Sequence, residues 1–158
     1  MDSRNLFFTP VTYRLLRSEY LAGLVACGAL AWLHLDEIRW PAVVGLFAVV
    51  DVIGYLPGHL AWRRARGGPV PRVYYLLYNT MHSLLTAGLV AGAWSVLIDA
   101  EWALLALPLH LFGDRSLFGN FPKPFGIEFE PRTHPAYADF RRSYEHRADS
   151  PDVRVPVG

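Results

Sequence analysis

Four long apolar segments constrain what this chain can fold into more than any other feature of its sequence. They span residues 19–35, 40–60, 73–98 and 102–118. Crossing the hydrocarbon core of a bilayer takes about 20 apolar residues, with a range of about 17 to 25. A soluble amphipathic helix would show a polar stripe every three or four residues, and these segments mostly do not. The pattern predicts an all-α fold, a four-helix transmembrane bundle, rather than a very apolar soluble bundle.

Composition supports this prediction and excludes other classes of protein. Charged residues make up 18% of the 158 residues and hydrophobic residues 53%, whereas a soluble domain usually carries about 25% charged residues. The formal net charge of +1 excludes a strongly basic nucleic-acid-binding protein. The single cysteine, Cys27, excludes a disulfide framework and a thiolate zinc cluster.

The basic residues indicate the orientation of the predicted bundle. Arginines precede the first segment and crowd the connection between the second and third, whereas the other two connections are mainly acidic. They are Arg4, Arg14 and Arg17, then Arg63, Arg64, Arg66 and Arg72. Because cytoplasmic loops carry an excess of Lys and Arg, both termini are expected in the cytoplasm.

Two regions flank the predicted transmembrane domain, which covers residues 19–118. Residues 1–18 mix apolar residues with arginines and are expected to lie at the membrane interface. Residues 119–158 hold half of the 12 prolines and are expected to form an extended cytoplasmic tail, with a short helix around residues 137–147. Three residues of this tail would allow it to fold back over a cavity, although a solvated tail is the preferred interpretation. These are Glu128, Glu130 and His134.

Ionisable residues inside the apolar segments are the strongest functional signal, because inserting one into a membrane costs about 2.5 to 3.5 kcal/mol. Asp51, His82 and His110 each lie eight or nine residues from the cytoplasmic end of their segment, which is ~12–14 Å along a helix. Glu19 and Asp114 lie nearer the same surface. We therefore expect one polar layer on the inner-leaflet side.

The polar residues of each predicted helix also share a face. The stripes are Asp51, Tyr55 and His59 on the second helix, Tyr75, Asn79, His82 and Thr86 on the third, and His110 with Asp114 on the fourth. A polar group that faced lipid would have no hydrogen-bond partner. The three stripes are therefore expected to converge on a cavity that opens to the cytoplasm.

Two imidazoles and two carboxylates form a typical nitrogen and oxygen ligand set for a divalent metal. We predict that Asp51, His82, His110 and Asp114 bind Zn²⁺, Fe²⁺ or Mn²⁺, since no thiolate accompanies them. A metal with an open position makes water a nucleophile at neutral pH. Asp114 or Glu19 would then act as general base.

Residues beside these ligands have a functional and a structural interpretation, and the sequence leaves both open. Arg115 would hold a phosphate or carboxylate of a substrate, or would pair with Asp114 at the helix end. Asn79 would support the site or only bond across helices. Tyr55 and His59 are predicted supporting residues, and His59 is also compatible with a structural role near the helix end.

The motifs in these segments resemble those of a group of known proteins. They are Asp51-x-x-Gly54-Tyr55, Tyr78-Asn79-x-x-His82 and His110-x-x-x-Asp114-Arg115, followed by Gly119. This order resembles an uncharacterised family of small bacterial four-helix integral membrane proteins, and the similarity covers most of the hydrophobic part. The sequence after Gly119 departs from the family's pattern. The resemblance implies a multi-pass protein of the bacterial inner membrane, and no established activity.

The leading hypothesis is a membrane-embedded, metal-dependent hydrolase that acts on a lipid or amphiphile at the cytoplasmic leaflet. Loose similarity to membrane-bound metal-dependent hydrolases agrees with it. The alternatives are a b-type haem electron carrier with His82 and His110 as axial ligands, an accessory subunit of a larger membrane complex and, last, a small proton-coupled carrier. Membrane lipids and an amphiphilic small molecule are the expected partners, nucleic acid is not, and a homo-oligomer is left open.

Overall fold

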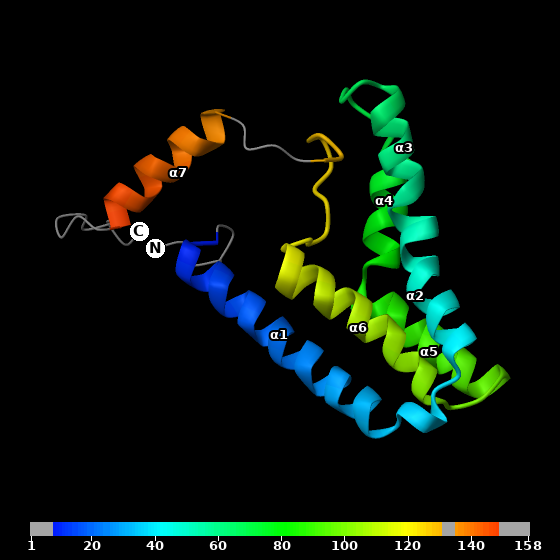
Figure 1. The fold of residues 1–158 in the computed structure, drawn as a ribbon. Helices are drawn as coiled ribbons and strands as arrows, with labels where there is room; N and C mark the ends of the chain where they lie inside the picture. The colour runs from blue at the N-terminus through cyan, green and yellow to red at the C-terminus, as the bar shows by residue number, and fades with distance from the viewer. Residues whose placement is uncertain (1–7, 131–134, 149–158) are drawn as a thin grey trace, which may run out of the picture.

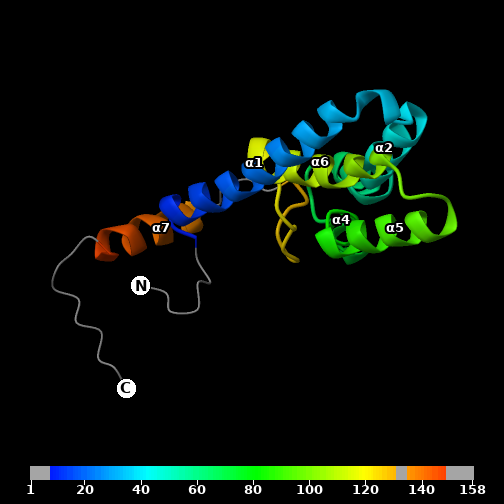
Figure 2. The same ribbon diagram turned by 90° about the horizontal axis from the view of Figure 1, so that it is seen from below.

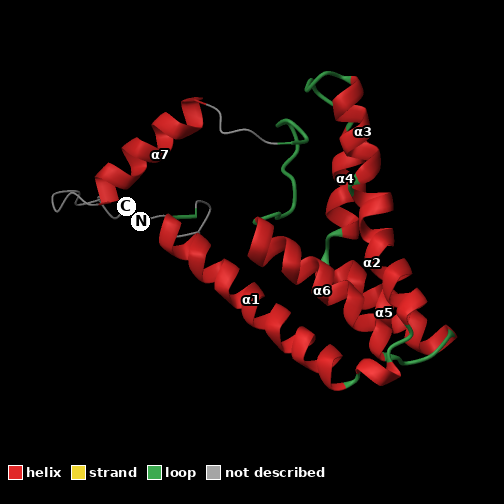
Figure 3. Ribbon diagram, viewed as in Figure 1, coloured by secondary structure: helices red, strands yellow, loops and turns green. Residues whose placement is uncertain are grey.

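The computed structural model describes residues 8–130 and 135–148, and this part of the chain is helical, with no strand (Figures 1 and 3). The longest helix, α1 (Pro10–Leu33), begins where the Thr9 hydroxyl accepts a hydrogen bond from the Thr12 amide at 3.2 Å. Pro10 suits this start, because the first turn of a helix leaves its N–H groups unpaired. The segments predicted as an interfacial region and as a first membrane helix therefore share one continuous helix, apart from residues 1–7, which lie outside the described residues.

The second apolar segment forms α2 (Trp40–Gly54) and α3 (Leu56–Arg64), which adjoin at Tyr55. Together they make a helix of 25 residues with a mean hydropathy of 1.7. It is the one helix in the described chain that is long and apolar enough by itself to cross a membrane. Pro57 lies in the first turn of α3 and has no amide to donate to the preceding turn, which accounts for the irregularity at Tyr55.

The third segment does not form the single helix predicted for residues 73–98. It is divided into α4 (Arg72–Met81) and α5 (Leu84–Leu97), which meet at an angle of 58°. Ser83 is extended and its hydroxyl accepts a hydrogen bond from the Leu85 amide at 3.2 Å, so it caps a new helix in mid-segment. As a pair the two helices pass the same test for a membrane span.

The fourth segment is also irregular. It comprises η2 (Trp102–Leu105), α6 (Ala106–Gly113) and η3 (Asp114–Phe118), which is a π-helical turn. Gly119 ends this turn in the left-handed conformation, with φ at 71°. A side chain at Gly119 would also collide with the Tyr13 hydroxyl of α1.

The helices pack around a small core in which α2 contacts α4, α6 and η2. Helix α1 lies along α6 and η3, and Figures 1 and 2 show α1 and α6 side by side. The close approach of α1 and α6 is possible because Gly23 has no side chain to meet the Phe112 ring. The buried apolar side chains are Leu46 and Val50 of α2, Ala87 of α5, and Ala106, Leu107 and Leu111 of α6.

Residues 119–130, here called the return segment, correct the expectation of a solvated tail. The segment runs back along α4 (Figure 1), and Phe129 within it is 0% exposed. Its ring contacts Tyr55, Tyr75 and Tyr78. The predicted helix around residues 137–147 is confirmed as α7 (Pro135–Ala148). His134, the third predicted covering residue, lies outside the described residues.

Candidate metal centre

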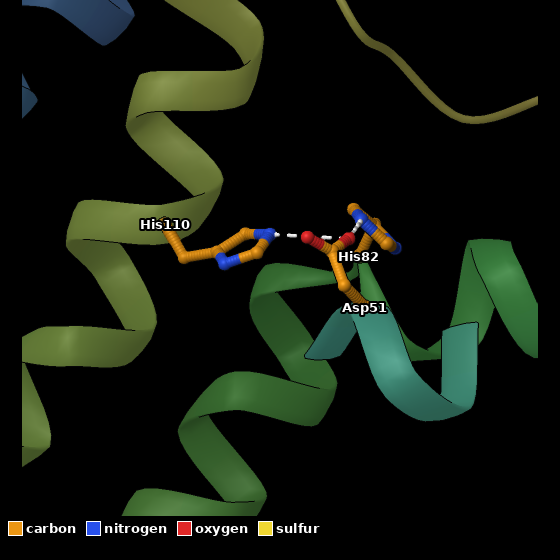
Figure 4. A group of neighbouring side chains, drawn as sticks. All are labelled: Asp51, His82 and His110. Carbon is orange, nitrogen blue, oxygen red and sulfur yellow. Dashed lines mark ion pairs between the residues drawn. The ribbon is translucent and has the colours of Figure 1, made fainter. Parts of the chain in front are cut away.

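The structure brings three of the predicted ligands together from three elements (Figure 4). Asp51 comes from α2, His82 lies in the break between α4 and α5, and His110 comes from α6. One ligand atom from each residue lies within 4.8 Å of the other two. The polar groups of separate elements thus meet, as predicted, and they are close enough to hold a metal ion.

Asp114 contacts the same two imidazoles. His82 Nε2 lies 3.4 Å from Asp51 Oδ1 and 3.4 Å from Asp114 Oδ2. His110 Nε2 lies 3.6 Å and 3.7 Å from the same two oxygens. These distances exceed the roughly 2.7–3.2 Å of an N–H···O hydrogen bond. Asp114 is nevertheless not in the group whose ligand atoms all lie within 4.8 Å of one another, which consists of Asp51, His82 and His110.

His82 is oriented by the end of its own helix. Its Nδ1 lies 3.0 Å from the Tyr78 carbonyl oxygen, and its ring stacks on the Tyr78 ring at 4.0 Å between centroids. A proton on Nδ1 donates to that carbonyl, so the Nε2 lone pair faces the carboxylates. Metal-binding histidines are commonly held in this way, with the second ring nitrogen bonded to a carbonyl or carboxylate.

Gly54 allows His82 to approach α2. A Cβ atom at Gly54 would lie 2.8 Å from Met81 Cβ and 3.1 Å from His82 Nδ1. Any larger residue would therefore push the end of α4 away from Asp51. Gly58, one turn further along the chain, allows Phe129 of the return segment to approach α3. A Cβ atom at Gly58 would lie 2.2 Å from Phe129 Cζ.

His110 makes its polar contacts through Nε2 alone. The residue is 5% exposed, and its ring packs on Phe47 at 4.5 Å between centroids. Its Nδ1 is buried and has no hydrogen-bond partner within the described part of the chain. Leaving a buried polar atom unpaired costs about 1–3 kcal/mol, so the position of this ring is not explained by its own hydrogen bonding.

A cavity of about 340 Å³ lies over these side chains. Its floor is formed by Asp51, His82 and Asp114. The remaining lining residues are Tyr55, Tyr78, Phe118, Asn120, Lys123 and Glu130, of which the last three belong to the return segment. The return segment therefore covers the site, which was the less favoured of the two interpretations of the tail.

Asn79 holds the return segment in place. Its side-chain amide donates to the Lys123 carbonyl at 2.8 Å and accepts from the Lys123 amide at 2.6 Å. Asn79 therefore bonds to the tail rather than across helices. The Lys123 ammonium donates to the Phe129 carbonyl at 2.5 Å and lies 3.7 Å from Glu130 Oε2. Burial lowers the pKa of Lys123 from its ordinary value.

Tyr55 and His59 connect the cavity to the same segment. The Tyr55 hydroxyl lies 3.0 Å from His59 Nδ1, and that nitrogen lies 3.3 Å from Glu130 Oε1. Tyr55 lines the cavity, whereas His59 lies behind it. Both are thus supporting residues that position Glu130, and neither is within the group able to hold a metal.

Arg115 has a different role from either of the two predicted for it. The residue is 7% exposed, and its guanidinium donates to the Tyr20 hydroxyl at 2.8 Å and to the His82 carbonyl at 3.0 Å. The helix break removes the next-turn N–H that would otherwise bond to this carbonyl. Arg115 replaces that donor, so it positions His82 and contacts neither a substrate space nor Asp114.

Glu19 does not belong to the site, which corrects its assignment as a general base. It is exposed on α1 and is not among the residues lining the cavity. Successive residues of a helix project about 100° apart, and it is the next residue, Tyr20, that faces Arg115. The helix was predicted at the right place, but its rotation about its own axis was not.

The charges around the cavity favour a divalent cation. Asp51, Asp114 and Glu130 line it together with a single basic residue, Lys123. With neutral imidazoles the lining therefore carries a formal charge of −2, which a divalent cation would balance. The Asp51 side chain is 49% exposed and that of Asp114 is 18% exposed, so these are partly exposed charges that a nearby cation would stabilise.

A haem does not fit between the two histidines. A porphyrin would occupy the plane between the two axial Nε2 atoms. Carboxylate oxygens of Asp51 and Asp114 lie within 3.4–3.7 Å of both atoms. These oxygens occupy the space that the macrocycle would need.

The sequence analysis missed Lys123, Asn120 and the role of Phe129. One signal was available for Phe129. It is an apolar aromatic residue in a proline-rich tail that was expected to be solvated, and such a residue is a candidate for burial. No family model, curated protein or solved structure matches this chain. Membership of the small bacterial four-helix family therefore stays a prediction.

Proposed function

We propose that this chain is a metal-dependent hydrolase embedded in the bacterial inner membrane, with four membrane-crossing segments and both termini in the cytoplasm. Its site would open to the cytoplasmic leaflet and act on a lipid or amphiphilic small molecule. The resemblance to the small bacterial family supports this placement. The arginine-rich connection between α3 and α4 supports the orientation.

Outward-facing apolar side chains support the membrane placement. On α5, Leu85, Leu89 and Val96 are 73%, 66% and 84% exposed. On α1, Val11 and Val25 are 70% and 63% exposed. Apolar patches of this kind on more than one helix are unfavourable in water and favourable against lipid.

The observation that carries the proposal is the grouping of Asp51, His82 and His110, of which Asp51 and His82 line the cavity. Asp51, His82 and His110 would hold the metal, and their nitrogen and oxygen donors suit Zn²⁺, Fe²⁺ or Mn²⁺. A bound divalent cation supplies Lewis acidity and lowers the pKa of a water in its open position.

The chain's own residues would supply the remaining steps. Asp114 reaches the cavity, lies beside both imidazoles and would accept the proton of the attacking water. Tyr55 and Tyr78 form walls that would orient the substrate, and the exposed Phe118 ring would contact its apolar part. The return segment limits the access of bulk water to the floor.

Metal analysis of the full chain, purified in detergent, tests the proposal. We expect about one Zn, Fe or Mn per chain in the wild type, and loss of that metal in Asp51→Asn and His82→Gln. Asp36→Asn is the matched control, because it makes the same change at an exposed site outside the metal centre. A wild-type protein that stays folded and takes up none of the three metals would contradict the metal centre. A loaded protein that hydrolyses no ester or phosphoester amphiphile would contradict the hydrolase.

A further inference from the structure

A second recess, unconnected with the metal centre, lies between the beginning of α1 and α7, which Figures 1 and 2 show near one another. Its volume is about 680 Å³. The lining residues that matter here are three arginines and three aromatic residues: Arg14, Arg17, Arg141, Phe8, Tyr13 and Tyr137. None of the recess's described lining residues is acidic, and none also lines the metal cavity.

The hydrogen bonds described for the α1 arginines leave their charge uncompensated by a carboxylate. Arg17 donates from Nε and Nη2 to the Ser116 carbonyl, at 2.8 Å and 2.6 Å, and from Nη2 to the Leu117 carbonyl at 2.9 Å. Arg14 donates from Nε to the Pro10 carbonyl at 3.2 Å. Carbonyl groups fix a guanidinium in position without neutralising it. These contacts leave other N–H groups of Arg14 to meet an anion, and a planar guanidinium binds a phosphate with two parallel hydrogen bonds.

Apolar surface adjoins these charges. Val11 and Leu15, which flank Arg14 on α1, are 70% and 61% exposed, and Phe8 in the recess is 52% exposed. A soluble phosphate would make no use of this surface. A phospholipid would contact both the arginines and the apolar surface, with its headgroup against the guanidinium groups and its acyl chains along α1.

We propose that this recess binds the phosphate of an anionic phospholipid at the cytoplasmic leaflet. The inference rests on the membrane placement proposed above, and not on the metal centre. In the proposed orientation, the recess lies where an anionic leaflet attracts juxtamembrane arginines. The site would fix the depth of α1, and through it the position of Tyr20 beside Arg115.

Native mass spectrometry of the full chain in detergent, titrated with phosphatidylglycerol or phosphatidylcholine, tests the inference. We expect the wild type to retain phosphatidylglycerol in preference to phosphatidylcholine. Arg14→Gln should weaken that retention by about fivefold, the effect of one basic residue near an anionic surface. Arg64→Gln is the control, since it removes an equal charge from the exposed end of α3, outside the recess.

Three results would overturn the inference. Equal weakening by Arg64→Gln would show diffuse surface charge instead of a site. Equal retention of phosphatidylcholine would remove the requirement for an anion. Displacement of the lipid by an equal concentration of glycerol phosphate would show that the acyl chains contribute nothing. The metal content of the same samples separates the two proposals, because loss of lipid binding should leave the metal in place.

Discussion

Histidines and carboxylates meet at three places in the described part of the chain, and two of these places differ in kind. Near the end of α1, His34 Nδ1 lies 2.8 Å from Glu37 Oε1, and its ring stacks on Trp102 at 3.7 Å between centroids. In the metal centre, His82 and His110 lie 3.4–3.7 Å from their carboxylates. The first pair satisfies itself with a direct hydrogen bond. In the second set each Nε2 atom faces two carboxylate oxygens at distances longer than a hydrogen bond.

The first region, here called the distal cluster, is completed by an ion pair between two connections. Arg39 donates from Nε to Glu101 Oε2 at 2.9 Å, and its Nη2 also bonds that carboxylate. Trp94 donates to the same carboxylate at 2.7 Å. Every polar group named here has a direct partner, and the cluster closes the ends of α1, α2 and α5. The two regions therefore differ in geometry: His34 has one direct carboxylate partner, whereas His82 and His110 each face the same two carboxylates at longer range.

The largest expected effect compares the two regions by removing one histidine from each. His82→Ala should abolish metal binding, with a loss well beyond the roughly 10- to 100-fold that removing a supporting residue causes. His34→Ala should leave the metal content unchanged, because His34 belongs to the distal cluster. Metal content by elemental analysis and helix content by circular dichroism decide the matter. Loss of metal in both variants, with folding intact, would contradict the distinction.

Arg115 tests how the candidate site is positioned, because its buried guanidinium donates a hydrogen bond to the His82 carbonyl. Arg115→Met should weaken metal affinity by about 10- to 100-fold, as expected for a group that positions a ligand. Tyr20→Phe removes one neutral hydrogen bond to the same guanidinium and should cost only about 1 kcal/mol of folding stability. Competition with a metal chelator gives the affinity and thermal unfolding gives the stability. Equal metal affinity in Arg115→Met and the wild type would refute the positioning role.

Replacing glycines that allow close packing should have the next largest effect on stability. Gly54→Ala should displace Met81 and His82 and cost about 1–3 kcal/mol of stability, together with metal affinity. Gly58→Ala should displace Phe129 instead and loosen the return segment, which limited proteolysis would detect. Gly88→Ala is the control, because no atom in the described chain lies within 4 Å of its added Cβ. It should be neutral, or stabilising by up to about 1 kcal/mol.

Lowering the pH should change the two regions at different pH values. This is the smallest of the expected effects. Hydrogen bonds from Arg39 hold the pKa of Glu101 below its ordinary value of 4.5. The stability that Glu101 contributes is therefore complete above pH 4.5 and is lost as the pH falls through its lowered pKa. Protons compete with a metal for imidazole nitrogens at a higher pH than for carboxylates, because imidazole is the stronger base. As the pH falls, metal should be lost before the Glu101 interactions break. Metal content and tryptophan fluorescence follow the two events, and their occurrence at the same pH would contradict two separate regions.

The sequence predicted the site residues correctly where their positions depend only on regular helix geometry. Asp51, His82 and His110 could be placed on facing stripes at one level, because their depth depends only on residue spacing and a common rise per residue. The composition likewise indicated helices throughout the apolar segments. Both results depend on local regularity, which the amino-acid order expresses directly.

Sequence reasoning failed where regular structure stops. Ser83 looks like one more small residue in an apolar segment, and only its cap geometry shows that a helix begins there. The role of Arg115 follows from that break, since an unbroken helix would have no carbonyl to offer it. Phe129 is buried by contacts with residues more than 50 positions earlier in the chain. Such long-range contacts leave no periodic trace.

The π-helical turn of η3 has a consequence for how this chain tolerates changes of length. A π-turn holds about one residue more than an α-turn, so deleting a single codon between Ser116 and Phe118 would restore an ordinary helix there. An α-turn and a π-turn each complete about one full rotation, so the residues after the deletion would keep roughly their direction. His110 precedes the deletion, and Lys123 and Phe129 would stay on the side of α4. The π-turn is therefore a place where the chain can lose one residue without turning the return segment away from the cavity.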